Sequence, residues 1–301
     1  MEKECLEAPR NQNLPAAFIG MGKVGTALAC ALHDADYPIA AVYDIRPSAM
    51  DRAATHTGAR RCRSAAEAAG LADVIFLTTP DDAIESACRN LAEEGILCRG
   101  KRVLHVSGSA GLDLLDAARR SGAVVGCIHP LQSFPDIDSA ILSLPGSAFG
   151  LTLDDDLKEW ATSLVAALGG FPIFLSDRDK PLYHAAACMA SNYLVALSDA
   201  VRRLYRSFGL TDDEALKASR PLIAGTLRNI ERKGTVSALS GPIERGDAGT
   251  VKRHLAALAL SCPDLLPVYR HLGLLTVDVA ARKNSADLER LDIIKEMLCK
   301  E

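Results

Sequence analysis

Short apolar, β-rich runs alternate with helical segments from Ala16 to about Ser176. Each run has the length of a buried strand, and the segment after the first run carries apolar residues at helical spacing. The runs are AAFIG (16–20), IAAVYD (39–44), DVIFLTT (73–79), RVLHVS (102–107), AVVGCI (123–128), AFGLTL (148–153) and PIFLS (172–176). Strands that alternate with helices predict an α/β fold with a doubly wound, mostly parallel sheet.

The pattern changes after Ser176, where the β-rich runs end and long helical repeats take over. Pro181 suits a first helical turn, because the N–H that proline lacks has no partner there. We therefore expect two domains. The first is an α/β domain over residues 1–176, of which residues 1–14 form a disordered leader, and the second is an all-helical domain over residues 177–301.

Helix boundaries are also readable in the second part. Gly209 suits a helix end, and Thr211 with Glu214 has the spacing of a capping box at the start of the next helix. Gly234 is expected to end that helix. Pro221 falls inside the same pattern and is expected to kink or split it, because its ring removes a helical hydrogen bond.

The first apolar run leads into FIGMGKVG, which places Gly20, Gly22 and Gly25 in a G-x-G-x-x-G arrangement. These glycines permit a tight turn, close approach of a pyrophosphate and packing of the helix on the strand. Asp44 ends the second run 19 residues after Gly25. Strand, helix and acid together favour a dinucleotide site over a glycine-rich turn without a ligand.

The cofactor is expected to be NAD or NADP. Asp44 favours NAD through both ribose hydroxyls, whereas Arg46 favours NADP by pairing with a 2′-phosphate, and the sequence leaves this choice open. The residues expected to hold the cofactor are Gly20, Met21, Gly22, Lys23, Val24, Gly25, Asp44, Arg46, Thr78, Thr79, Pro80 and Ser107.

Three polar loops follow strands whose carboxyl ends meet at one edge, where open α/β sheets bind ligands. In the loop TTPDD (78–82), Thr79 and Pro80 either border the nicotinamide or make an ordinary strand-ending turn. In the loop SGSAG (107–111), Ser107 and Ser109 lie beside glycines that admit a ligand. Either serine is equally suited to cap a helix, and Ser109 is our candidate for substrate binding.

The third loop, HPLQSF (129–134), carries the strongest catalytic candidate. His129 has a side chain whose ordinary pKa near 6.5 suits proton transfer to or from a carbonyl or amine during hydride transfer. Gln132, three residues on, is a candidate for substrate binding. The alternative is a histidine that only ends a strand.

The segment DKPLYHAAACMASNYL repeats Lys180, His184, Cys188 and Asn192 every four residues, which places them on one helical face. We predict that His184 and Asn192 are catalytic, with small neighbours leaving room for a ligand. The alternative is a helix packed against another, with His184 hydrogen-bonded inside. Lys180 is interpreted as a helix-start residue.

The loop LSGPIERGD (239–247) is dense in Gly, Pro and charge. Arg245 is the candidate partner for a substrate carboxylate. A functional loop and a salt-bridged helix start are both compatible with this pattern.

Composition narrows the function classes. The net charge is −4 with Lys and Arg scattered, which argues against nucleic-acid binding. The chain has no apolar run long enough for a membrane span and no signal peptide, so we expect a cytoplasmic protein. Nine cysteines without C-x-x-C pairs suggest reduced thiols, and the seven histidines lack zinc-site spacing, so no metal is expected.

Six motifs in this order resemble a bacterial family of Rossmann-like proteins with a C-terminal helical domain of unknown function. The motifs are FIGMGKVG, DVIFLTTPDDAI, HVSGSAGLDLL, GCIHPLQSFPD, YHAAACMASNYLVAL and ALSGPIERGDAGTVKRHLAAL. The resemblance covers Ala16 to about Arg282. It implies an NAD(P)-dependent oxidoreductase related to deazaflavin-dependent NADP oxidoreductases.

The layout is more distantly similar to pyrroline-5-carboxylate reductase, ketopantoate reductase, prephenate dehydrogenase and the β-hydroxyacid dehydrogenases. Prephenate dehydrogenases have a His-Pro pair like His129-Pro130. β-Hydroxyacid dehydrogenases and ketopantoate reductases carry Lys and Asn four residues apart where this chain has His184 and Cys188, so their lysine mechanism does not transfer directly. The resemblance also implies a homodimer formed through the helical domain.

Two hypotheses of different class follow. The first is an oxidoreductase that moves a hydride between the nicotinamide and a C=O or C=N carbon of a small, anionic metabolite. The second is a dinucleotide-binding sensor or scaffold without turnover, since fold alone does not exclude it. Convergence of His129 and His184 would favour the enzyme. Reduction of a deazaflavin is a third option, based on the resemblance alone.

Overall fold

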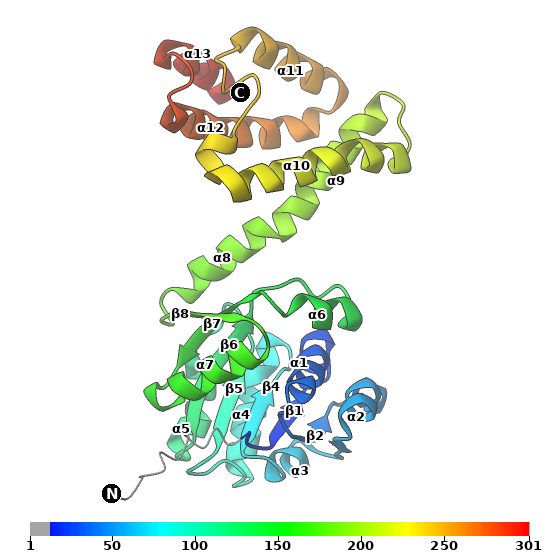
Figure 1. Cartoon of the computed structure of the whole chain (residues 1–301), viewed down its shortest axis with the longest axis vertical. Helices are drawn as coiled ribbons and strands as arrows, with labels where there is room; N and C mark the ends of the chain where they lie inside the picture. Colours follow the sequence, from blue (N-terminus) through cyan, green and yellow to red (C-terminus); the bar gives the residue numbers. More distant parts are fainter. Residues whose placement is uncertain (1–12, 301) are drawn as a thin grey trace, which may run out of the picture. The chain divides into compact units, whose positions relative to one another are not determined.

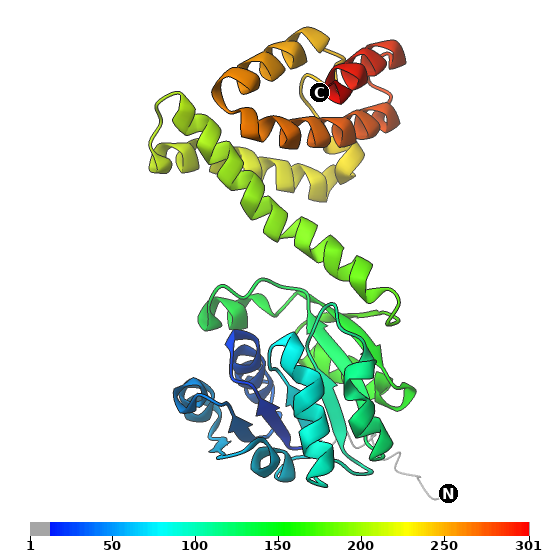
Figure 2. The same ribbon diagram turned by 180° about the vertical axis from the view of Figure 1, so that it is seen from behind.

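The computed structural model describes residues 13–300 and divides into two compact units, Met1–Ser191 and Asn192–Glu301 (Figures 1 and 2). The expected leader therefore lies outside the described residues except for residues 13 and 14. The first helix after the sheet, which we assigned to the second domain from sequence, belongs to the first unit. Each unit is described by itself.

An eight-stranded sheet forms the centre of unit 1, in the order β3-β2-β1-β4-β5-β6-β7-β8 (Figure 1). All neighbouring strands run parallel except β6 and β7. The strands are β1 (Ala16–Ile19), β2 (Ile39–Tyr43), β3 (Arg60–Arg61), β4 (Val74–Leu77), β5 (Arg102–His105), β6 (Val124–Pro130), β7 (Ala148–Leu153) and β8 (Phe171–Phe174). The predicted doubly wound, mostly parallel α/β sheet is confirmed, and the order of its first six strands is that of the Rossmann fold.

Helices cover both faces of this sheet (Figures 1 and 2). Apolar residues of α1, α2 and α7 pack on one face, and those of α3, α4 and α5 on the other. The helices of unit 1 are α1 (Lys23–Asp34), α2 (Asp51–Thr57), α3 (Ala65–Gly70), α4 (Asp81–Glu93), α5 (Asp116–Arg120), α6 (Ile137–Ser143), α7 (Lys158–Ala167) and α8 (Lys180–Ala190), with short 3-10 turns η1 (Pro47–Met50), η2 (Leu112–Leu115) and η3 (Asp155–Leu157).

The core of unit 1 explains why the strands read as unbroken apolar runs. Strands β1 and β4 are buried on both faces, as parallel strands between two helical layers must be. On one face Phe18 and Phe76 stack with ring centroids 4.7 Å apart. On the other, Ile75, Leu77 and Ile84 are buried in one cluster. This double layer fixes the carboxyl edge of the sheet, from which the polar loops extend.

Unit 2 is helical, as predicted. Its elements are α9 (Asn192–Ser207), α10 (Asp212–Ala238), α11 (Ala248–Ser261), η4 (Pro263–Leu265), α12 (Leu266–Lys283) and α13 (Leu288–Cys299). A compact core includes Val251, Val277, Leu291 and Ile294. No helix within residues 13–300 is long and apolar enough to cross a bilayer.

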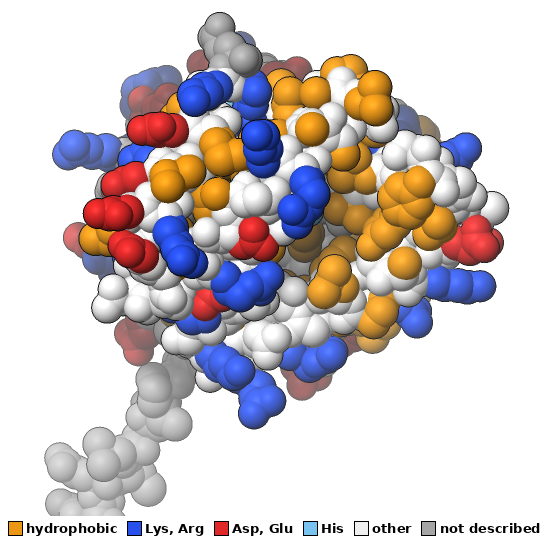
Figure 3. Space-filling view, turned by 90° about the horizontal axis from the view of Figure 1, so that it is seen from above, with side chains coloured by type: hydrophobic (Ala, Val, Ile, Leu, Met, Phe, Trp, Pro, Cys, Tyr) orange, Lys and Arg blue, Asp and Glu red, His pale blue; other side chains and the backbone are white. Residues whose placement is uncertain are grey.

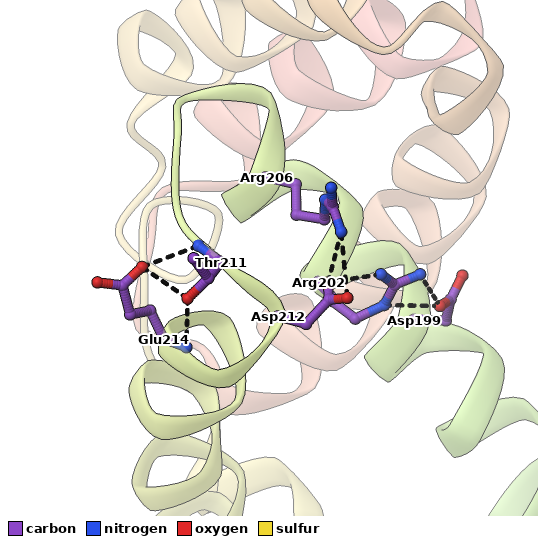
Figure 4. Close-up of polar contacts among 6 residues, drawn as sticks. All are labelled: Asp199, Arg202, Arg206, Thr211, Asp212 and Glu214. Atoms are coloured by element: carbon purple, nitrogen blue, oxygen red, sulfur yellow. Dashed lines mark hydrogen bonds and ion pairs between the residues drawn. The ribbon is translucent and has the colours of Figure 1, made fainter.

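The start of α10 confirms the predicted capping box (Figure 4). The backbone N–H of Glu214 donates to Thr211 Oγ1, and the N–H of Thr211 donates to Glu214 Oε2 at 2.8 Å. Beside it, Asp212 accepts from Arg202 at 2.7 Å and from Arg206 at 3.0 Å. Both devices use exposed side chains, so they anchor this helix end without contributing to a core.

The sequence predicted that Pro221 kinks or splits this helix, and the structure shows that α10 is not split there. The non-helical backbone inside this helix is instead at Gly234, with φ 73° and ψ 165°, and one more helical turn follows to Ala238. Pro221 is exposed, and so is Lys217, whose carbonyl loses its helical partner. Water can therefore hydrate that carbonyl, which makes the proline tolerable.

Two helices of unit 2 expose apolar faces. None of the residues of α9 is buried, and in α10 only Ala215 is. A groove of about 450 Å³ between them is lined by Val195, Leu216, Ile223 and Leu227, among others. Figure 3 shows hydrophobic side chains gathered around a hollow on one face of the molecule. Exposed apolar surface of this kind marks an interaction face more often than an ordinary surface.

Candidate functional site

The turn between β1 and α1 fits tightly against the end of β4. Gly20 has φ +101°, and a Cβ there would lie 2.6 Å from the backbone N of Thr79. A Cβ on Gly25 would lie 2.3 Å from Gly20 O and 2.5 Å from Thr78 Oγ1. Thr78 Oγ1 donates to Gly20 O at 2.5 Å, which ties the two loops together. These two positions therefore require glycine.

Gly22 differs, because a Cβ there would meet no protein atom within 4 Å. It is the N-cap of α1 with an extended backbone, so the amides of the first turn, including those of Lys23 and Val24, lack helical partners beside this open space. Open space in front of free helix-start amides is what a pyrophosphate group needs. The loop thus fits the dinucleotide that the sequence motif predicts.

Asp44 joins the end of β2 to the same loop. Its Oδ2 accepts the backbone N–H of Met21 at 2.7 Å, and its Oδ1 accepts that of Arg46 at 2.8 Å. The Asp44 side chain is only 9% exposed, whereas that of Arg46 is 72% exposed with Nε 3.6 Å from Asp44 Oδ1. A carboxylate accepts about four hydrogen bonds, so Asp44 keeps acceptor capacity for ribose hydroxyls.

Thr79 and Pro80 lie at the end of β4 beside this loop. Thr79 Oγ1 is buried and has no hydrogen-bond partner among the described residues. Buried hydroxyls are normally paired, so an unpaired one next to the glycine loop is compatible with a missing ligand atom. Pro80 is the N-cap residue of α4 and is exposed.

Asp81 connects this region to the loop after β5. Ser107 Oγ donates to Asp81 Oδ2 at 2.7 Å and accepts the backbone N–H groups of Ser109 and Ala110 at 3.3 and 3.1 Å. Ser109 Oγ lies 3.4 Å from the same Asp81 oxygen. The Ser107 hydroxyl therefore shapes the turn that Gly108 begins, and the alternative in which it caps a helix directly is not what the structure has.

His129 and His184 meet across Gly108. Their ring centroids are 6.1 Å apart at an interplanar angle of 73°. A Cβ on Gly108 would lie 2.8 Å from His129 Nε2 and 2.6 Å from His184 Cδ2, so only glycine fits between them. His129 comes from the end of β6 and His184 from α8, both within unit 1. The two histidines that the sequence singled out are thus brought together.

Tyr183 completes this cluster. Its hydroxyl lies 3.0 Å from His129 Nδ1, and the two ring centroids are 5.6 Å apart. A Cβ on Gly150, in β7, would lie 2.7 Å from the Tyr183 oxygen. The absence of a side chain at Gly150 therefore makes room for Tyr183 to reach His129.

Burial sets the protonation states of this cluster. Burial, aided by the nearby His184 and Lys180, lowers the pKa of His129 to about 4. Burial raises the pKa of Tyr183 to about 12. Near neutral pH the pair is therefore a neutral imidazole hydrogen-bonded to a neutral phenol, and the tautomer decides which of the two donates.

A buried lysine lies beneath the same loop. Lys180 is 2% exposed, and its Nζ donates to Ser107 O at 3.1 Å and to Cys127 Sγ at 2.9 Å. Cys127 Sγ in turn donates to Ser107 O at 3.2 Å. Burial raises the pKa of the Cys127 thiol, so this group stays protonated near neutral pH.

His105, at the end of β5, is wholly buried beside this lysine. Its Nδ1 accepts the backbone N–H of Ser107 at 3.1 Å, and its Nε2 has no partner among the described residues. Burial and the charge of Lys180 lower the pKa of His105 to about 4. A neutral ring with an engaged Nδ1 must carry its proton on Nε2.

The remaining candidates lie apart from this cluster or in unit 2. The amide nitrogen of Gln132 donates to Ser143 O and to Ser147 Oγ, each at 3.2 Å. Asn192 begins α9 and is exposed, and Arg245 is exposed in the loop before α11. Helix α8 ends at Ala190, so the expected stripe from Lys180 to Asn192 does not lie on one unbroken helix.

Three residues of the cluster had contacts that the sequence did not reveal. Lys180 begins α8, as its position before Pro181 predicted, but its buried contacts with Ser107 and Cys127 were not predicted. Tyr183 and Asp81 lie in motifs that we quoted but carried no assigned role. Within residues 13–300, no group of three His, Cys, Asp or Glu side chains is arranged to hold a metal ion.

Comparisons with known proteins agree with this layout. A model of a Rossmann-like domain matches residues 3–130, and a model of a domain of unknown function, DUF2520, matches residues 147–276. The comparison with curated proteins gave no match.

Solved structures show the same fold. A candidate NADP oxidoreductase from Bacteroides fragilis is 20% identical with a TM-score of 0.70, covering 89% of this chain and 98% of its own. A Thermotoga maritima protein is 22% identical with a TM-score of 0.70, covering 89% and 99%. The pyrroline carboxylate reductase of Plasmodium falciparum, solved with NADP bound, is 14% identical with a TM-score of 0.62, covering 95% and 98%. These likenesses, all below 25% identity, show that the chain shares the fold of these proteins, while residues 3–130 and 147–276 match the Rossmann-like and DUF2520 domain models.

Proposed function

We propose that the protein is an NAD(P)-dependent oxidoreductase that transfers a hydride between the nicotinamide and a C=O or C=N carbon of a small, anionic metabolite. The observation that carries this proposal is the meeting of His129 and His184 across Gly108. Hydrogen bonds connect this loop to the loop after β4, and that loop to the glycine loop of the proposed dinucleotide site. Catalytic groups and a cofactor loop at one sheet edge are the arrangement that hydride transfer requires.

The cofactor would be held by Gly20, Gly22 and Gly25 with the first amides of α1, and its ribose by Asp44. When bound, the dinucleotide supplies or accepts the hydride. The Plasmodium falciparum relative carries NADP. In this chain the carboxylate of Asp44 favours NAD and the exposed guanidinium of Arg46 favours NADP, so both cofactors are tested below.

His129 is the proposed acid/base. With its pKa lowered to about 4, it is a neutral imidazole in the free protein, which takes a proton when an alcohol or amine is oxidised. A bound anion raises the pKa of a neighbouring imidazole, so an anionic substrate favours the protonated form that donates in the reverse direction. His184 is the alternative acid/base from the other side of Gly108, and Tyr183 orients His129.

The competing class is a sensor that binds the dinucleotide without turnover. A sensor needs no titratable groups close together, whereas His129, Tyr183 and His184 place three such groups in contact. This convergence supports the enzyme. Substrate contacts by Ser109, Gln132, Asn192 and Arg245 stay predictions from sequence, each to be tested by replacement with Ala and measurement of KM.

The test has two stages. Binding of NADH and NADPH is measured by cofactor fluorescence, and oxidation of each is then followed with a panel of 2-oxo acids, cyclic imines and a deazaflavin. We expect saturable binding of at least one cofactor and turnover with an anionic carbonyl or imine. Binding without turnover on any panel member would favour the sensor, and failure of both cofactors to bind would refute both classes.

We also propose a homodimer formed through the helical domain. Support comes from α9, which has no buried residue, and from the apolar groove that it forms with α10. A second copy would cover these faces and remove their apolar surface from water. Light scattering on the purified protein should give twice the chain mass, and Leu216→Glu should shift it toward the monomer. A monomeric wild type would contradict this assignment.

A further inference from the structure

We propose that the Ser107–Gly108 peptide, held in place by Lys180, presents the Gly108 N–H as a hydrogen-bond donor to a substrate carbonyl oxygen beside His129. The idea rests on the proposed oxidoreductase function and deepens it, because it names the substrate class: carbonyl compounds in preference to iminium ions. Gly108 N–H is thereby a catalytic donor and Lys180 a positioning residue.

The first observation is an unused donor. Gly108 is buried, and its N–H donates to no acceptor among the described residues. Its neighbours are satisfied, since the N–H groups of Ser109 and Ala110 donate to Ser107 Oγ and that of Ser107 donates to His105 Nδ1. Buried backbone N–H groups without a partner are rare in proteins, so this one calls for an acceptor that the chain does not supply.

The second observation fixes where this donor points. The carbonyl of Ser107 accepts from Lys180 Nζ at 3.1 Å and from Cys127 Sγ at 3.2 Å, both on its buried side. In a trans peptide the C=O and the following N–H point in opposite directions, and the structure has no cis peptide bond in its described residues. The Gly108 N–H therefore points away from Lys180 and out of the core.

The third observation is what Gly108 touches. An added Cβ would lie 2.8 Å from His129 Nε2 and 2.6 Å from His184 Cδ2, so the backbone at Gly108 lies directly against both rings. A substrate oxygen that accepts from the Gly108 N–H would thus lie beside the proposed acid/base. Two donors that meet at one oxygen form an oxyanion hole, which is worth most where water is excluded.

The chemistry follows for a carbonyl substrate. Hydride from the reduced nicotinamide adds to the carbonyl carbon, the C=O electron pair moves to oxygen, and the resulting alkoxide takes a proton from the protonated His129 to give the alcohol and a neutral imidazole. The nicotinamide is oxidised and the substrate is reduced. The Gly108 N–H stabilises charge on that oxygen. An iminium nitrogen carries a proton and a positive charge, so it cannot accept a hydrogen bond from the Gly108 N–H. The positive charge of Lys180 beneath the peptide also repels it.

Lys180→Met tests the positioning role, because methionine keeps the length of the side chain and removes the donor. In this variant the Ser107 carbonyl keeps Cys127 Sγ as a hydrogen-bond donor, so it is not left without a partner. Lys158→Met is the matched control, since Lys158 is exposed on the same unit. We expect Lys180→Met to bind NADH or NADPH as the wild type does, and to lose about 100-fold to 1,000-fold in kcat for a 2-oxo acid.

A second readout does not depend on turnover. The chain has three Ser–Gly pairs, Ser107–Gly108, Ser121–Gly122 and Ser240–Gly241. Only the amide of a glycine that follows a serine carries both labels when the protein is made by cell-free synthesis with ¹³C-carbonyl serine and ¹⁵N-glycine. An NMR spectrum selective for ¹³C–¹⁵N peptide bonds therefore shows three amide signals. Oxamate, an unreactive analogue of a 2-oxo acid, should shift the Gly108 signal in the wild type and in Lys158→Met, but not in Lys180→Met. The other two signals are internal controls.

The outcomes separate the two proposals. If oxamate does not change the chemical shift of the wild-type Gly108 amide, this inference is overturned even if both cofactors bind and turnover is normal. Equal losses of kcat for 2-oxo acids and cyclic imines in Lys180→Met overturn the preference for carbonyl oxygen. Failure of both cofactors to bind refutes the oxidoreductase but leaves the oxamate result to decide the donor. If Lys180→Met does not fold, the wild-type titration alone still decides.

Discussion

The two units treat polar and apolar groups in opposite ways. Unit 1 buries Lys180 and His105 at the end of its sheet, where burial is costly unless a specific arrangement requires it. Unit 2 leaves its α9 without a buried residue and exposes large apolar side chains such as Tyr193 and Leu222. Buried polar groups indicate chemistry, and exposed apolar groups indicate association. The comparison therefore separates the unit that should react from the unit that should assemble.

The largest effect should come from the histidine pair of unit 1. We expect His129→Asn to lower kcat about 100-fold to 10,000-fold, because general acid–base catalysis contributes that much. His184→Asn, tested singly, shows which ring carries the proton. Cofactor dissociation constants should stay unchanged, since the proposed cofactor contacts are made by Gly20, Gly22, Gly25 and Asp44 rather than by either ring. Unchanged rates in both variants would remove the catalytic assignment and with it the contrast between the units.

Acid should destabilise unit 1. His105 has a folded pKa of about 4, below the unfolded value of about 6.5, so the unfolded state binds more protons between these limits. Stability is therefore retained above pH 6.5 and lost as the pH falls toward 4, by on the order of 3 kcal/mol.

Trp160 makes this loss measurable, because it is the only tryptophan and lies in unit 1. Its fluorescence during urea unfolding should show the midpoint falling between pH 6.5 and pH 4. His105→Asn keeps an acceptor for the Ser107 N–H and should remove about half of this dependence, because His129 has the same lowered pKa of about 4 and keeps its own share. An equally steep dependence in the variant would contradict the assignment to His105.

Two glycines of the cofactor loop separate folding from binding. Gly25→Ala should cost about 1–3 kcal/mol of stability, because its Cβ would collide with Gly20 O and Thr78 Oγ1. Gly22→Ala has no protein atom within 4 Å of its Cβ, so its melting temperature should match the wild type while its affinity for the cofactor falls. Thermal melts and cofactor titrations on both variants check this. Tight cofactor binding by Gly22→Ala would argue against a pyrophosphate at this loop.

The smallest effect should come from unit 2. Thr211→Ala removes the capping box of α10 and should cost about 1 kcal/mol of stability with no change in kcat. Asp212→Asn weakens an exposed ion-pair network and should cost less stability than Thr211→Ala, because water screens these charges. Urea unfolding followed by circular dichroism measures both. A large loss of activity in Thr211→Ala would show that this helix end does more than hold a helix.

The sequence predicted the sheet well because its strands are buried on both faces. Such strands need unbroken apolar runs, and the runs at β1, β4, β5 and β6 lead directly into the loops of the site. Strand β3 was not predicted, since it consists of two exposed arginines, Arg60 and Arg61, at the sheet edge. An apolar pattern does not reveal the direction in which a strand runs, so the antiparallel pairing of β6 with β7 was not predictable from the sequence.

The site was predicted less completely, for a different reason. His129 and His184 were selected because histidine is chemically informative wherever it occurs. Lys180 is usually a surface residue, so its burial beneath the Ser107 carbonyl depends on tertiary contacts that no local pattern encodes. Gly150 was interpreted only as part of a strand, yet its missing side chain is what admits Tyr183.

The pairing of β6 with β7 limits where the chain can be divided between its two domain matches. The DUF2520 match begins at residue 147, at the start of β7, while the first compact unit continues to Ser191. A truncation at residue 147 would remove β7 and β8 from the sheet and leave β6 as an unpaired edge strand, which is prone to aggregation. It would also remove the lysine and the tyrosine of the cluster. The segment from 147 to 191 is therefore physically part of unit 1, although it lies in the DUF2520 match.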